Sequence, residues 1–96
     1  MNIENFIPLN QLSTHYQVEV SFFNNLNEMG LIEIQTIEQV EYIQEDKIQD
    51  IEKMVRMHHE LDVNIEGIDV VFNLLQKIHD LQEELMNAKR QLRRYE

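Results

Sequence analysis

The sequence predicts a mainly α-helical fold: a winged helix-turn-helix with a small β-hairpin wing, followed by a long C-terminal coiled-coil-type helix. Three observations support this prediction. Apolar residues recur at helical spacing in two short stretches, β-rich segments follow, and apolar steps of three and four residues then continue to the C-terminus. A chain of 96 residues with 43% hydrophobic content can form one small domain with an extension.

Two short helices are predicted, over residues 9–15 and 20–29. Pro8 suits a first helical turn, because its ring fixes φ and it has no amide proton to donate. Gly30 stands where a left-handed residue would end the second helix. Two short helices with so brief a connector are typical of a helix-turn-helix.

Two β-rich segments, 31–34 and 40–43, are interpreted as the hairpin of the wing. The residues between them contain no Asn-Gly or Gly signal, so the turn type stays open. A third helix is expected over 45–61, with acidic residues near its start, where the helix dipole favours them. Asn64 is a good N-cap for the next helix. We therefore predict a winged helix-turn-helix domain at 1–63 and a long helix for packing or dimerisation at 64–96.

The predicted C-terminal helix has an apolar seam of nearly four heptads. The seam consists of Val71, Leu74, Ile78, Leu81, Leu85, Ala88, Leu92 and Tyr95. A helix of about 30 residues is ~45 Å long and would outrun so small a domain. We expect a homodimer, with Leu74, Ile78, Leu81, Leu85 and Leu92 as its dimerisation residues. The alternative is a helix that folds back within its own chain.

Charge is distributed unevenly. Residues 1–46 contain eight acidic residues and no Lys or Arg (−8), whereas residues 47–96 contain ten acidic and eight basic ones (−2). Acidic residues could simply solvate a small domain, but soluble surfaces normally mix both signs. Because cations that neutralise phosphates supply most DNA affinity, nucleic acid is an unfavourable partner. A basic protein is the expected partner.

The predicted partner-binding residues lie on one side of the third helix: Asp46, Asp50, Lys53, Arg56 and Glu60. Asp46 and Asp50 form a like-charge i,i+4 pair, which costs a few tenths of a kcal/mol in an isolated helix. A basic partner would relieve this repulsion.

The order of elements resembles the MerR superfamily and, more closely, the CbpM family of chaperone-modulatory proteins. Three stretches carry the resemblance: Gly30-Leu31-Ile32-Glu33, the segment 55–68 (VRMHHELDVNIEGI) and the heptad tail. DNA-binding MerR regulators usually end the second helix with Thr-Leu-Arg-Tyr-Tyr-Glu, where this chain has Asn24 in place of Arg. Their wing normally begins with Pro and Arg, where this chain has Glu33 and Gln35.

The CbpM resemblance implies a protein that binds the J-domain of a DnaJ/CbpA-type co-chaperone and inhibits its Hsp70 co-chaperone activity by steric occlusion. The alternative is a MerR-type dimeric DNA-binding transcriptional regulator, which would rely on Lys47, Lys53 and Arg56. A third reading is a module that mimics the charge of DNA and caps another basic protein.

Several functions are not expected. With no cysteine, disulfides and thiol chemistry are excluded. The sequence lacks a phosphate loop and a nucleophile–base spacing, so we expect no enzyme activity and no cofactor. A metal site is not expected either, because His58 and His59 point about 100° apart on a helix. The start resembles no signal peptide and no apolar run matches a bilayer, so a cytoplasmic protein is expected.

Phe22 and Phe23 are adjacent in the predicted second helix, so they cannot share one narrow apolar stripe. We expect one ring in the core and the other over the wing. The alternative is that one ring is an exposed anchor for a partner.

Overall fold

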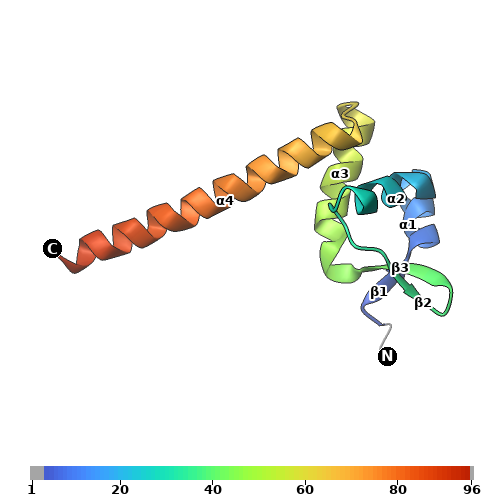
Figure 1. Ribbon diagram of the computed structural model, residues 1–96, viewed down its shortest axis with the longest axis horizontal. Helices are drawn as coiled ribbons and strands as arrows, with labels where there is room; N and C mark the ends of the chain where they lie inside the picture. The colour runs from blue at the N-terminus through green and yellow to red at the C-terminus, as the bar shows by residue number, and fades with distance from the viewer. Residues whose placement is uncertain (1–3, 96) are drawn as a thin grey trace.

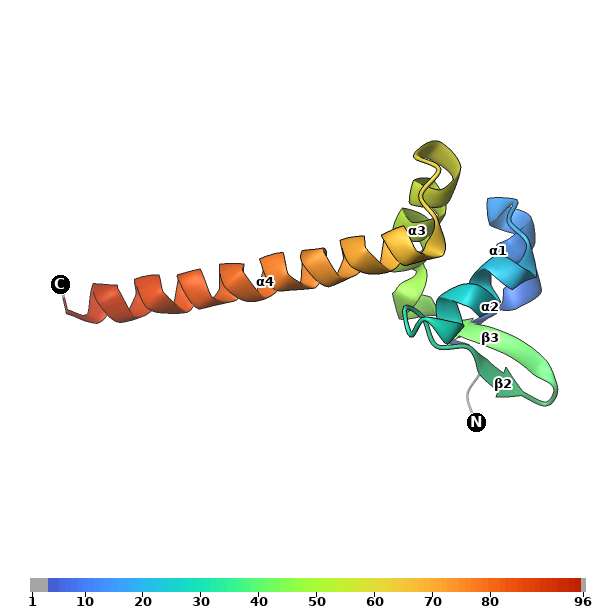
Figure 2. The ribbon, with the colours of Figure 1, turned by 45° about the horizontal axis from the view of Figure 1, so that its top comes forward.

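The computed structural model describes residues 4–95. In chain order the elements are β1 (Phe6–Pro8), α1 (Leu9–Tyr16), α2 (Val20–Glu28), β2 (Gln35–Ile37), β3 (Val40–Gln44), the 3-10 turn η1 (Glu45–Lys47), α3 (Ile48–Glu60) and α4 (Ile65–Arg94). The elements before α4 form a head, and α4 projects from it as a single rod (Figures 1 and 2). The predicted fold class is confirmed.

The two helices of the helix-turn-helix form as predicted. α2 ends at Glu28 with Met29 as its C-cap, and Gly30 follows with a φ of 79°, a left-handed conformation that glycine adopts without steric cost. The amide of Gly30 donates to Asn27 O and the amide of Leu31 donates to Leu26 O, both at 3.0 Å. This pair of hydrogen bonds is a Schellman motif, and it satisfies carbonyl groups that the end of the helix leaves unpaired.

The sequence predicted Pro8 in the first turn of α1, but the structure places it before the helix. It is the last residue of β1 and the N-cap of α1, with an extended backbone at φ −60° and ψ 138°. β1 pairs antiparallel with β3, and Pro8 lies opposite Tyr42. A residue without an amide proton is tolerated at the end of such an edge strand. No local pattern in the sequence predicts this three-residue strand, because its partner β3 lies far along the chain.

The prediction of a strand over 31–34 is wrong, because β2 begins at Gln35. The apolar residues of 31–34 serve the core instead: Ile32 is 7% exposed. The Asn27 side-chain oxygen accepts a hydrogen bond from the Ile34 amide at 3.1 Å, which holds this segment against the end of α2.

The β2–β3 hairpin confirms the predicted strand at 40–43, and β3 is the middle strand of the sheet, whose order is β1-β3-β2. Glu38 and Gln39 form the turn with positive φ angles of 51° and 69°. Two consecutive left-handed residues are the conformation of a type I′ turn. This turn favours Asn and Gly, so its type was not visible in the sequence.

The third helix, predicted over 45–61, begins as η1 and continues as α3. Its inner face packs on the head through Ile51, Met54 and Val55, all buried. After α3, Asn64 caps α4 as predicted, since its side-chain oxygen accepts a hydrogen bond from the Gly67 amide at 2.8 Å.

The core draws on every helix and on the central strand: Leu9, Leu12, Phe22, Phe23, Leu26, Ile32, Ile43, Ile51, Met54, Val55 and Ile68. Ile68 of α4 is fully buried, so the first turns of α4 pack as part of the head. Residues 73–95 are all exposed. The division into 1–63 and 64–96 stays a prediction. No helix in the described part of the chain has the length and apolarity needed to cross a bilayer.

Candidate protein-interaction surfaces

α2 is the second helix of the helix-turn-helix, the element that enters the DNA major groove in proteins that use this motif. Its exposed residues are Ser21, Asn25, Asn27 and Glu28. None of them is a cation that could neutralise a phosphate. The helix therefore presents an acidic and amide-rich face to solvent.

The predicted partner-binding residues are all exposed, but they do not form one site. Lys53, Arg56 and Glu60 line a hollow of about 360 Å³ on α3, beside Met57 and Leu61. Arg56 Nε lies 3.6 Å from Glu60 Oε2, and both side chains are more than 60% exposed. Solvent screening leaves such a pair little effect on stability.

The other two residues of this set lie apart from that hollow. Asp46 lies in η1 and lines a different hollow of about 440 Å³, together with Asn5, Phe6 and Gln44. Asp50 lies in the first turn of α3 and lines neither hollow. Partner contact by these residues stays a prediction.

A groove between α2 and the start of α4 was not predicted. A hollow of about 510 Å³ lies at the N-terminal end of α2 and a second of about 470 Å³ at its C-terminal end. Both are lined by Asn25, Ile65 and Glu66, so they lie next to each other, and we call the two hollows together the α2–α4 groove. In both views the first turn of α4 lies beside α2 (Figures 1 and 2). The sequence could not reveal this groove, because its walls come from three separate segments.

Phe22 lies at the base of this groove and also belongs to the core. It is 6% exposed, and it contacts Phe23 edge-to-face with ring centroids 5.7 Å apart. Phe23 is fully buried. Neither ring is therefore an exposed anchor for a partner. The expectation that one of them covers the wing is wrong, because Phe22 stacks on His58 of α3.

The histidines at the end of α3 line the groove. The rings of His58 and His59 meet edge-to-face with centroids 5.5 Å apart. Within residues 4–95, no group of three or more His, Cys, Asp or Glu side chains is placed to hold a metal ion.

Tyr16 and Glu52 link α1 to α3. The Tyr16 hydroxyl donates to Glu52 Oε1 at 3.1 Å. Burial, followed by this hydrogen bond and the charge of Glu52, raises the pKa of Tyr16 to about 12. The pair joins two elements of the head, and its role is structural.

The apolar seam of α4 is open to solvent. The five predicted dimerisation residues are between 50% and 62% exposed: Leu74, Ile78, Leu81, Leu85 and Leu92. A continuous stripe of large apolar side chains on a projecting helix is a surface suited to another helix. Pairing through it stays a prediction.

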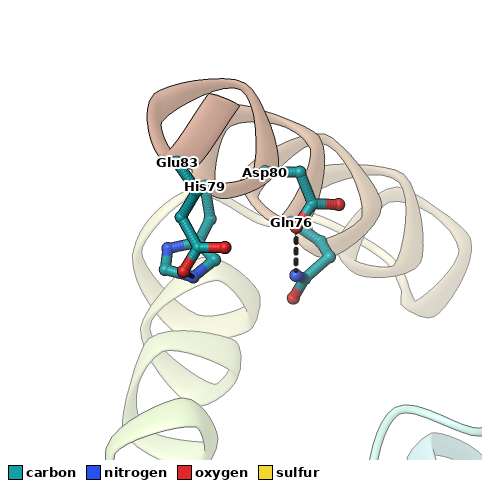
Figure 3. A network of polar contacts seen from close by, with 4 residues as sticks. All are labelled: Gln76, His79, Asp80 and Glu83. Atoms are coloured by element: carbon teal, nitrogen blue, oxygen red, sulfur yellow. Dashed lines mark hydrogen bonds and ion pairs between the residues drawn. The ribbon is translucent and has the colours of Figure 1, made fainter. Parts of the chain in front are cut away.

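The polar side of α4 is held by contacts within the helix. Gln76 Nε2 donates to Asp80 Oδ1 at 3.1 Å, and His79 Nε2 lies 3.2 Å from Glu83 Oε1. Both are i,i+4 pairs, each joining adjacent turns (Figure 3). At 100° per residue they lie opposite the seam, so the polar pairs do not obstruct it.

The family model for MerR HTH family regulatory proteins matches residues 7–90. The chain belongs to this family. The match runs from β1 through most of α4. Comparisons with curated proteins and with solved structures found no match.

This MerR-family chain departs from the DNA-binding pattern on α2. Asn24, which stands where the DNA-binding regulators that this chain resembles usually have Arg, is half-buried in the middle of the helix. Glu33 and Gln35, which stand where the wing of those regulators normally has Pro and Arg, lie just before and at the start of β2. α2 and the start of the wing therefore contain no Lys or Arg.

Proposed function

We propose that this MerR-family protein is a chaperone modulator that binds the J-domain of a DnaJ/CbpA-type co-chaperone and inhibits its Hsp70 co-chaperone activity. The observation that carries the proposal is the unmixed negative charge of residues 1–46, the N-terminal part of the head. All eight acidic residues within 1–46 are exposed, and this stretch has no Lys or Arg to offset them. The resemblance of residues 55–68 to CbpM proteins supports the choice of partner.

The charge acts mainly on association. A surface of one sign attracts a partner of the other sign and raises the rate of encounter, an effect that salt screens within about 8–10 Å at physiological ionic strength. A J-domain offers Hsp70 a basic helical face. An acidic protein bound to that face would exclude Hsp70, so inhibition requires occlusion and no chemistry.

The proposed active species is a homodimer paired through the seam of α4. Residues 73–95 are all exposed, and in proteins most of the stability of a helix comes from packing of its amphipathic face. The last turns of α4 carry Lys89, Arg90, Arg93 and Arg94. A parallel pair would place these cations beside those of the second chain, whereas an antiparallel pair separates them. We therefore propose an antiparallel pair with one head at each end.

The experiment that tests the proposal is an Hsp70 ATPase assay stimulated by the DnaJ/CbpA-type co-chaperone. Adding the protein at micromolar concentration and low salt should suppress the stimulation while leaving the basal ATPase rate unchanged. A pull-down with the isolated J-domain should retain the protein, and added salt should release it. Unchanged stimulation together with no retention would refute the proposal.

A second candidate is a dimeric MerR-type transcriptional regulator, favoured by the family match. Its phosphate contacts would have to come from Lys47, Lys53 and Arg56, which are exposed on η1 and α3 rather than on α2. A gel shift with pooled duplexes at low salt distinguishes the candidates. Sequence-dependent retention of DNA would favour the regulator.

A further inference from the structure

We infer that the α2–α4 groove is the docking site for a cationic amphipathic helix. The inference rests on the proposed function for the source of that helix, the J-domain of the co-chaperone. The groove, and not the outer face of α3, then provides the main contact with the partner.

The shape of the groove fits a short helical segment. Its two hollows follow α2 from the Gln17 end to the Met29 end and share Asn25, Ile65 and Glu66. α2 has nine residues, so at 1.5 Å per residue it is ~13 Å long. A bound helix lying along it would make contact over two to three turns.

The apolar part of the groove supplies a floor. Phe22 lies at the base of the first hollow, Ile65 lines both, and Met29 lines the second and is 39% exposed. Helices that bind in grooves place an apolar face inward at i, i+3, i+4 and i+7. These three side chains offer such a face a surface to cover, and methionine adapts to varied partners.

The charge of the groove selects a cationic helix. Glu19 lines the first hollow, Glu28 the second and Glu66 both, while neither hollow has a Lys or Arg among its lining residues. The hollow on α3 differs, because Lys53 and Arg56 line it together with Glu60. A cationic helix is therefore attracted along the whole α2–α4 groove, whereas at α3 it meets two like charges. The same three carboxylates would repel phosphate groups.

Two matched triple variants test this inference. The groove variant is Glu19→Gln, Glu28→Gln and Glu66→Gln, and the α3-face variant is Asp46→Asn, Asp50→Asn and Glu60→Gln. All six side chains are exposed, so both variants should fold, and each changes the net charge from −10 to −7. Circular dichroism and unfolding midpoints check the fold. Binding is measured with the isolated J-domain and with a synthetic Lys/Leu amphipathic helical peptide.

We expect the groove variant to bind both probes about tenfold more weakly and the α3-face variant to change by less than about twofold. As a second check, Asn25→Arg should weaken binding by adding a cation and bulk to the shared wall, whereas Gln49→Arg on α3 should have little effect.

The outcomes separate the inference from the proposed function. If the J-domain binds and only the α3-face variant weakens it, or both variants weaken it equally, the groove assignment is overturned while the proposed function stands. If the peptide binds in a groove-dependent way and the J-domain does not bind, the proposed partner is wrong and the groove assignment stands. If neither probe binds the unmodified protein, both are refuted.

Discussion

The ring of Phe22 stacks on the imidazole of His58, with centroids 4.7 Å apart and planes inclined by 30°. This contact joins the second helix of the helix-turn-helix to the end of α3. The same phenyl ring forms the base of the α2–α4 groove. The core and the proposed docking surface therefore share a residue, and the position of α2 beside α4 depends on packing beneath it.

Phe22→Ala should lower the free energy of unfolding by about 3–5 kcal/mol, because it removes a buried ring and leaves a cavity between α2 and α3. Urea unfolding followed by circular dichroism measures the change. Leu61→Ala is the control, since Leu61 is 69% exposed and its loss should change stability by less than about 0.5 kcal/mol. Equal effects of the two substitutions would show that Phe22 is not buried as described.

Asn64→Ala should destabilise the protein by about 1 kcal/mol, because the Gly67 amide loses its capping acceptor. Asn64→Asp keeps an acceptor at this position and should retain most of the stability. Thermal unfolding of the three proteins checks this order. A wild-type midpoint for Asn64→Ala would contradict the capping role.

Stability should depend on the ionisation of Tyr16 at high pH. Its pKa is raised from 10.0 to about 12 in the folded protein, so the folded state holds the proton more tightly than the unfolded state. The stability from this group is fully present below about pH 10, and it is lost as the pH rises through about 12. Difference absorbance titration against Tyr16→Phe isolates the residue.

Glu52→Gln provides the matched variant for this titration. It removes the charge that faces the phenol, so the Tyr16 pKa should fall, while burial keeps it above its ordinary value. A Tyr16 titration that is unchanged by Glu52→Gln would show that the two side chains do not interact in solution.

Leu81→Lys with Leu85→Lys should convert a dimer to a monomer, because it places cations in the middle of the seam. Helix content should fall as well, since α4 beyond residue 72 is exposed along its whole length and loses the packing that a second helix supplies. Sedimentation velocity and circular dichroism measure both changes. Glu83→Lys, on the opposite side of the helix, should leave the assembly intact. A wild-type protein that sediments as a monomer would refute the pairing.

Much of the fold follows from local patterns in the sequence. The end of α2 and the start of α4 were predictable, because Gly30 and Asn64 act on the residues next to them. The length of α4 was predictable from its heptad spacing. β1 was not, because three residues around a proline become a strand only by pairing with β3. The strand predicted over 31–34 was wrong for a related reason. Ile32 is apolar because it enters the core, not because it lies in a strand.

For the candidate site, the sequence predicted the negative charge but not the location. The absence of cations before Lys47 is visible in the sequence, and from it we predict a basic partner. The location is not visible, because Glu19, Asn25 and Glu66 meet only when α2 packs beside the start of α4. Helical spacing predicted partner-binding residues on the third helix instead. Such spacing identifies residues that share one helix, and it cannot identify residues that packing brings together.

The central claim is that this acidic head binds a cationic protein in place of DNA. Fluorescence anisotropy tests it most directly, with the protein titrated into a labelled J-domain and, separately, into labelled duplexes at low and at physiological salt. The account predicts saturable binding to the J-domain that weakens as salt is added, with no saturable binding to DNA. Saturable, sequence-dependent binding to a duplex with none to the J-domain would contradict it.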